Sequence, residues 1–112
     1  MNSLDRTLAA LADPTRRAAI ALLRKEPLRS SEMASALATS RPAMSRHLRI
    51  LRRAGLVEEK GLDDDARARL YRLRRRPFVE LRGWLDDVEM FWTAQLGAFK
   101  AHAERSARSR RR

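Results

Sequence analysis

The spacing of apolar residues predicts a mostly helical chain, because they recur every three or four positions over much of its length. The first helix is indicated by Leu4, Leu8 and Leu11. Asp13 and Pro14 indicate the start of a second helix, since aspartate caps helix N-termini and proline suits the first turn. That helix should continue to about Lys25, before Pro27. Its buried side is expected to hold Ile20, Leu22 and Leu23.

Two short helices joined by a tight turn are predicted next. Ser30 or Ser31 can cap the first of them, whose apolar residues are Met33, Ala34 and Leu37. After residues 38–39, Ser40 caps a fourth helix with Pro42 in its first turn. This helix should reach about Arg53 and end at Gly55. The pair has the form of a helix-turn-helix motif.

A β-hairpin is predicted after the fourth helix. Its strands lie within residues 56–60 and 67–73, on either side of a turn rich in Gly and Asp at 61–65. A hairpin in this position would be the wing of a winged helix-turn-helix fold.

The last predicted helix runs from Pro77 to about Ala103 and carries a narrow apolar stripe. A stripe of this kind usually marks an interface, and we expect it to pair with its copy in a two-fold dimer. The expected dimer residues are Leu4, Leu8, Phe78, Leu81, Trp84, Leu85, Val88, Phe91, Trp92, Leu96 and Phe99. Two other interpretations stay open: a ligand pocket lined by Trp84, Phe91 and Trp92, and simple packing onto the domain's own core.

The expected fold class is therefore mostly α with a small β-hairpin, in the order α-α-α-α-β-β-α, and dimeric. Residues 1–103 should form one DNA-binding and dimerisation domain. Residues 104–112 contain five arginines and are expected to be a disordered basic tail.

The charge balance favours a polyanionic partner, either nucleic acid or an acidic membrane surface. The chain carries 25 Lys and Arg against 14 Asp and Glu, a net charge of +11, and only Lys25, Lys60 and Lys100 are lysines. An arginine-rich genome would give a similar excess, so the positions of the arginines must decide. The N-terminus has no signal-peptide pattern and no apolar run would span a bilayer, so we expect a cytoplasmic, nucleoid-associated protein without membrane contact.

The fourth helix has the residue pattern of a helix that reads DNA. Met44, Leu48 and Leu51 form its buried side, and the segment 41–53 has five arginines and no acid. Such a helix must anchor its back to a core and present short polar or Arg side chains to base edges. The alternative is an ordinary solvated basic face. The expected DNA-binding residues are Ser40, Arg41, Pro42, Ser45, Arg46, His47, Arg49 and Arg53 in this helix, with Arg67 and Arg69 in the wing. His47 lies between the two faces and can equally bond locally, and Arg67 and Arg69 can also be solvated beside Asp63–Asp65.

Four segments together resemble the ArsR-type winged-helix repressors: 11–17 (LADPTRR), 32–34 (EMA), 40–48 (SRPAMSRHL) and 54–57 (AGLV). The resemblance covers residues 4 to about 100. It implies a homodimer that binds inverted repeats and usually represses its own operon, with residues 41–53 in the major groove, 57–73 as the wing, and the first and last helices in the dimer.

Two departures from the family pattern matter. The family often has Ser or Thr where Arg29 stands, so we expect the capping box to be lost and Ser30 to cap one residue later. Metal-sensing members have cysteines in the segment matching 32–37, whereas this chain has none at all. His102 is the only imidazole near the acids of the last helix, too few nitrogen ligands for a transition metal. We therefore expect no metal site and no cofactor, as in the branch without a recognisable metal site.

The prediction is a sequence-specific dimeric regulator of double-stranded DNA, a repressor of its own operon and not an enzyme. With two His and no Cys, the chain offers no convincing catalytic set. One alternative is a sensor of the same fold whose small-molecule or metal effector releases DNA, the effector being unknown. Another is a non-specific nucleic-acid condenser that acts through its Arg-rich tail.

Overall fold

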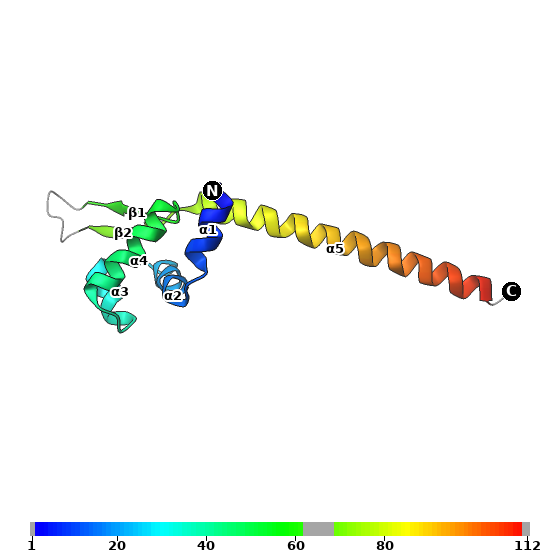
Figure 1. Cartoon of the computed structure of the whole chain (residues 1–112), viewed down its shortest axis with the longest axis horizontal. Helices are drawn as coiled ribbons and strands as arrows, with labels where there is room; N and C mark the ends of the chain where they lie inside the picture. The colour runs from blue at the N-terminus through cyan, green and yellow to red at the C-terminus, as the bar shows by residue number, and fades with distance from the viewer. Residues whose placement is uncertain (1, 62–68, 111–112) are drawn as a thin grey trace. The chain divides into compact units, whose positions relative to one another are not determined.

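The computed structural model describes residues 2–61 and 69–110. The chain divides into two compact units, Met1–Glu80 and Leu81–Arg112. The elements, labelled in Figure 1, are α1 (Ser3–Leu11), α2 (Pro14–Leu23), α3 (Ser30–Ala36), α4 (Arg41–Arg53), β1 (Val57–Lys60), β2 (Leu70–Leu73) and α5 (Arg75–Arg110). This order confirms the predicted mostly helical fold with one β-hairpin.

The buried side of helix α1 contains both a polar and an apolar residue. The Asn2 side chain caps it by accepting from the backbone N–H of Asp5 at 2.8 Å. Thr7 and Ala10 are its buried residues, and the Thr7 hydroxyl is satisfied by donating to the Ser3 carbonyl at 3.1 Å. Leu8 shares a stripe with Leu4 and Leu11 but is exposed, because the buried side is centred on Thr7 and Ala10 instead.

Helix α2 begins as predicted and ends slightly early. The Asp13 side chain caps it and Pro14 opens its first turn. It ends at Leu23, two residues before the predicted Lys25. Ala19 and Leu23, four residues apart, define its buried side, so Ile20 and Leu22 pack against the core only partly buried.

Helix α3 begins differently from the prediction. Its N-cap residue is Arg29, and Ser30 is already helical. The Glu32 carboxylate accepts from the Arg29 backbone N–H at 3.0 Å. This is one of the two hydrogen bonds of a capping box, and it does not require a Ser or Thr side chain at the N-cap. The predicted Ser30 cap is therefore wrong, because half of the capping box works without a capping side chain.

The turn between α3 and α4 is held by two backbone hydrogen bonds. The N–H of Ala38 donates to the Ser35 carbonyl at 3.3 Å, and that of Thr39 donates to the Ala34 carbonyl at 3.0 Å. Ala38 adopts φ +51°, a left-handed conformation that usually requires glycine. The helix-turn-helix therefore contains an alanine in a strained position.

Helix α4 has the bounds that its sequence predicts. The Ser40 hydroxyl accepts from the Ala43 N–H at 3.2 Å. At the other end Gly55 adopts φ +79°, and the N–H groups of Gly55 and Leu56 donate to the carbonyls of Arg52 and Leu51, both at 3.0 Å. This pair of hydrogen bonds is a Schellman motif, which explains why glycine ends the helix.

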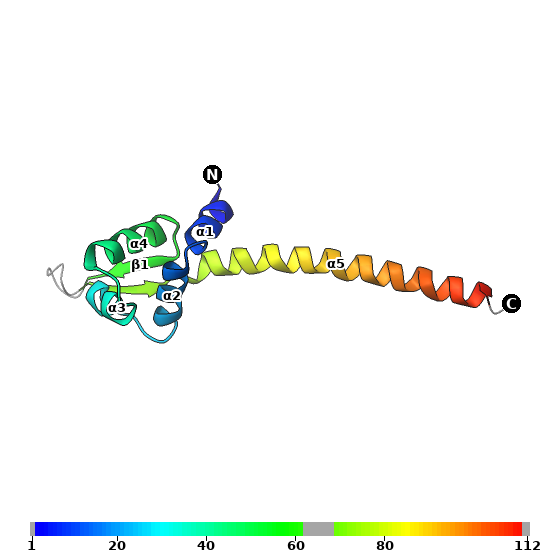
Figure 2. The same cartoon turned by 60° about the horizontal axis from the view of Figure 1, so that its bottom comes forward.

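The two strands form an antiparallel hairpin in which Val57 pairs with Leu73 and Lys60 with Leu70. Tyr71 of β2 also pairs with Leu28, through hydrogen bonds of 2.8 and 3.2 Å, so the segment before α3 lies against the hairpin. Figures 1 and 2 show α4 beside the hairpin. The core beneath them contains Ala10, Ala19, Leu23, Met33, Ala34, Met44, Leu48, Leu51, Leu56 and Val57.

Helix α5 is longer than predicted at both ends. It begins at Arg75, with Pro77 in its first turn, where the backbone N–H groups have no partner in the helix in any case. It continues past Ala103 to Arg110, so the expectation of a disordered tail is wrong for residues 104–110. The reason is composition: Ala, Arg and Glu favour helix, and neither Gly nor Pro follows Gly97.

Candidate nucleic-acid interface

Helix α4 has a buried apolar side and an exposed side that is mainly basic. Met44, Leu48 and Leu51 are at most 1% exposed. The exposed residues of the helix include the predicted DNA-binding residues Arg41, Pro42, Ser45, Arg46, Arg49 and Arg53, together with Ile50 and Arg52. The helix contains no Asp or Glu, so its exposed side is positively charged while its buried side is fixed on the core. The arrangement has the shape and charge that insertion into a DNA major groove requires.

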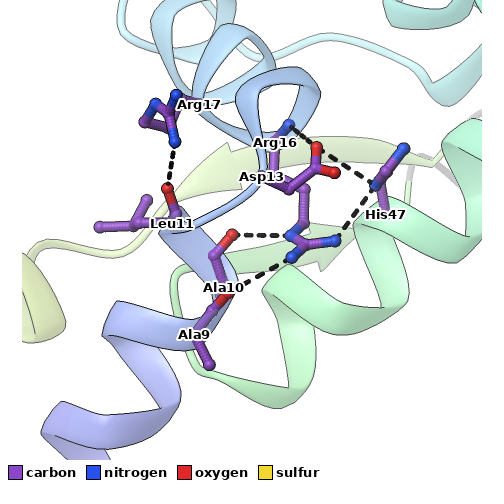
Figure 3. A network of polar contacts seen from close by, with 7 residues as sticks. All are labelled: Ala9, Ala10, Leu11, Asp13, Arg16, Arg17 and His47. Carbon is purple, nitrogen blue, oxygen red and sulfur yellow. Dashed lines mark hydrogen bonds and ion pairs between the residues drawn. The ribbon is translucent and has the colours of Figure 1, made fainter.

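One flank of α4 is attached to the junction of α1 and α2 through His47, as Figure 3 shows. The guanidinium Nη1 of Arg16 lies 3.4 Å from His47 Nδ1, and the carboxylate of Asp13 lies 4.0 Å from the same nitrogen. His47 is partly buried there. Of the two interpretations of His47, the structure therefore supports local bonding; a direct DNA contact stays a prediction.

The junction itself explains the chemistry of the segment LADPTRR. Arg16 donates from Nε to the Ala10 carbonyl at 2.6 Å, and Arg17 donates to the Leu11 carbonyl at 2.8 Å (Figure 3). These carbonyls end α1 and have no partner within the helix. The backbone N–H of Arg16 also donates to Asp13 at 3.1 Å, and this bond is the main cause that holds the pKa of Asp13 below its ordinary value of 3.8. One short segment thus ends α1 and begins α2.

The opposite flank of α4 is attached to the hairpin through Glu59. The Glu59 carboxylate pairs with Arg52 of α4, with Arg69 just before β2 at 2.8 Å, and with the Tyr71 hydroxyl at 3.3 Å. Burial raises the pKa of the Tyr71 hydroxyl above its ordinary value of 10.0, and the Glu59 charge acts in the same direction. Tyr71 therefore stays protonated and donates the hydrogen bond. Sequence reasoning missed this contact, since no local pattern links β1 to α4.

A basic hollow of about 760 Å³ lies between α3, α4 and the hairpin. Its lining residues are Arg29, Ser30, Ser31, Arg41, Ser45, Glu59, Arg69 and Tyr71. Arg41, Ser45 and Arg69 were predicted DNA-binding residues, and the hollow brings them together. Arg29, Ser30 and Ser31 were missed, although the first helix of a helix-turn-helix is expected to cross the DNA backbone. Arg67, the other predicted wing residue, lies outside the described residues.

The second unit exposes large apolar side chains. Leu85, Phe91, Trp92, Leu96 and Phe99 are between 48% and 73% exposed, and the rings of Phe91 and Trp92 pack edge to face at 6.2 Å. Phe78, which the sequence placed in the same stripe, belongs to the first unit and packs against its core. The assignment of the stripe to a dimer stays a prediction.

In residues 2–61 and 69–110, no three His, Asp or Glu side chains gather closely enough to hold a metal ion. No helix in that part of the chain is both long and apolar enough to cross a bilayer. The predicted absence of a metal effector stays a prediction.

The chain is similar in sequence to regulatory proteins. Residues 13–59, from the cap of α2 to the third residue of β1, match the family model described as bacterial regulatory protein, arsR family. The HTH-type transcriptional regulator Rv2034 of Mycobacterium tuberculosis is 39% identical over 97 residues, which cover 87% of this chain and 85% of the relative.

Solved structures show the same likeness. An ArsR-like transcriptional regulator from Rhodococcus sp. RHA1 superposes with a TM-score of 0.78 at 29% identity, covering 91% of each chain. The transcriptional regulator HlyU from Vibrio vulnificus CMCP6 superposes with a TM-score of 0.57 at 28% identity, covering 74% of this chain and 83% of the other. Sequence and structure therefore point to the same group of regulators.

Proposed function

The chain belongs to the ArsR family of bacterial regulatory proteins, and we propose that it acts as a homodimeric repressor of an inverted-repeat operator. As a member of this family it is a DNA-binding transcriptional regulator and not an enzyme. The proposal adds three finer points, which are the dimer, the two-fold symmetric operator and the negative sign of regulation.

The observation that carries the proposal is the two-sided character of α4. Its buried residues fix the helix on the core, and its exposed arginines, Arg46, Arg49 and Arg53, point away from that core. Arginine donates bidentate hydrogen bonds to guanine in the major groove, which is the commonest base-specific contact. The basic hollow beside α4 would accept the adjacent phosphates. Sequence reading by α4 and backbone binding by its neighbours follow from this division.

A two-fold dimer is supported by the exposed apolar stripe of the second unit. Leu85, Trp92 and Phe99 stand on one side of α5 and are all more than 40% exposed. Pairing this side with its copy removes the stripe from water, and a closed two-fold pair uses the same surface on both chains. Two copies of α4 would then read two half-sites related by the same symmetry.

Repression follows from occupancy. A dimer that covers an operator beside its own promoter competes with the polymerase for the same DNA. We expect the protein to act at the nucleoid, where that DNA lies.

An effector-responsive form of this function has one observation in its favour. A hollow of about 530 Å³ lies between α1 and α4, lined by Ala9, Ala10 and Ile50 and bordered by Arg6, Arg16 and Arg53. An amphipathic carboxylate would match its apolar floor and cationic rim, and would contact Arg53 of the DNA-reading helix. Dodecanoate added to the protein–DNA complex should then release DNA from the wild type and less from Ile50→Glu; no release at any soluble concentration would exclude this class.

The main proposal is tested by selecting duplexes from a random library with the full chain and footprinting the enriched sequences. We expect a pseudo-palindrome with half-site centres about one helical turn apart, roughly 34–36 Å. A reporter behind the selected site should lose expression when the protein is supplied. An asymmetric single footprint, or rising expression, would contradict the dimeric operator or the repressor assignment respectively.

A further inference from the structure

An acidic side chain stands in the middle of the basic DNA-facing surface. Glu59 is 16% exposed, and its two carboxylate oxygens bind Arg52 of α4 and Arg69 beside the wing strand. It borders a hollow of about 290 Å³ whose other walls include Ser45 and Arg49 of α4. One carboxylate therefore binds two guanidiniums, one from α4, the helix proposed to read bases, and one from the residue just before β2.

Contacts other than those of Glu59 also hold the hairpin in place. Leu56 and Val57, where the hairpin begins, are buried in the core, and Tyr71 is bonded through its backbone to Leu28. An acid at this position also weakens attraction to phosphate, which dominates the affinity of proteins for DNA of any sequence. Glu59 thus lowers general affinity at a place where other contacts also hold the hairpin, which points to a role in selectivity.

We propose that Glu59 is a specificity-determining positioning residue. It holds Arg52 and Arg69 in one arrangement and neutralises part of their charge. The two arginines therefore contribute less to the binding of phosphates in DNA of arbitrary sequence. The contribution of base contacts by α4 to total affinity is larger as a result. This inference rests on the proposed sequence-specific function.

The neighbouring residue provides a matched control. Glu58 lies on the same strand and also holds two arginines, Arg72 and Arg74. Successive residues of a strand point to opposite faces, so Glu58 and its partners lie on the other side of the hairpin from Glu59. Glu58→Gln and Glu59→Gln change the net charge equally and each releases two guanidiniums.

The experiment compares the full-length wild type, Glu59→Gln and Glu58→Gln by fluorescence anisotropy. The probes are the duplex selected from the random library and a random-sequence duplex of equal length, each over a series of salt concentrations. We expect Glu59→Gln to bind random duplex more tightly, with a salt slope steeper by about 0.9 for each additional phosphate that the variant neutralises. Its ratio of selected to random affinity should fall about tenfold, the scale of one misread base pair. Glu58→Gln should keep the wild-type ratio.

A second variant covers the case in which Glu59→Gln is poorly folded. Glu59→Asp keeps the charge but is too short to reach both arginines, so its affinity for random duplex should stay near wild type while the ratio falls about fivefold or more, the lower end of the range set by one base pair. If both Glu59 variants keep the wild-type ratio, or if Glu58→Gln loses as much, the positioning role is refuted. A wild-type ratio near one would instead refute the proposed function itself, and the role with it.

Discussion

At the residue scale, two side chains attach α4 to the rest of the first unit from opposite flanks. His47 contacts Arg16 on one flank, and Arg52 pairs with Glu59 on the other. In a helix, positions 47 and 52 point about 140° apart, on either side of the buried stripe. The helix is therefore restrained against rotation about its own axis, and its exposed arginines keep a fixed direction.

The first residue-level prediction concerns those arginines. Arg46→Ala and Arg49→Ala should each weaken binding to the selected duplex by about 1–3 kcal/mol and relax preference at one base position. Arg24→Ala removes an exposed arginine at the end of α2 and serves as the control for charge alone. Competition binding measures the loss; equal losses for all three variants would mean that α4 acts only as a source of charge.

A second prediction concerns the strained turn of the helix-turn-helix. Ala38 has φ +51°, a left-handed backbone conformation that is unfavourable for a residue with a Cβ atom but not for glycine. Ala38→Gly should therefore raise the free energy of unfolding by about 1 kcal/mol. Ala36→Gly, the same chemical change two residues earlier but inside α3, should lower it. Urea unfolding measures both, and a destabilised Ala38→Gly would show that the turn carries no strain.

A third prediction uses the titration of Asp13. Its pKa is lowered in the folded chain, chiefly by the backbone N–H of Arg16, so its charged form stabilises the fold. That stabilisation is complete above the ordinary pKa of 3.8 and is lost as the pH falls through the lower folded value. Asp13→Asn keeps a good N-cap and removes the titration. Its stability relative to wild type should rise as the pH drops below 3.8, followed by circular dichroism; a constant difference would contradict the assignment.

At the scale of elements, we expect the basic end of α5 to contribute to DNA affinity through its charge and not to sequence recognition. Deletion of residues 105–112 should weaken binding to selected and random duplexes by the same factor and flatten the salt dependence. Because residues 105–110 are helical, Arg105→Gln with Arg108→Gln removes charge without shortening the helix. Both variants should keep the ratio of selected to random affinity, and the double substitution, which removes two of the five arginines, should flatten the salt dependence less than the deletion. Loss of selectivity on deletion would assign sequence reading to this end instead.

The sequence was sufficient for elements whose ends are marked locally. Ser40, Pro42 and Gly55 bound α4 correctly, because capping and left-handed backbone depend on one residue and its near neighbours. The contacts that position α4 were not predictable in this way. Arg16 meets His47 across 31 positions of sequence, and no periodic pattern links residues so far apart. The end of α5 was misplaced because charge suggested disorder, whereas helix propensity decided the outcome.

At the scale of the whole molecule, dimerisation is the expected source of affinity and symmetry. Leu85→Glu with Trp92→Glu places two charges in the exposed stripe, at side chains 48% and 60% exposed, so the core of the first unit is untouched. Sedimentation analysis should show a monomer, with weaker binding to the selected duplex. Met90→Glu adds a charge on the opposite side of α5 and should leave the dimer intact. A double variant that stays dimeric would move the interface elsewhere.

The separation of anchoring and reading residues on α4 has an evolutionary consequence. The helix is held in place by five residues, Met44, Leu48, Leu51, His47 and Arg52. Arg46 and Arg49 take no part in those contacts, so they can be substituted by other residues without disturbing them. After gene duplication, a copy of this regulator can therefore acquire a new target through one or two substitutions while its fold stays intact. Divergence between such copies should concentrate at these exposed positions, and the two regulators would separate their targets before they separate their structures.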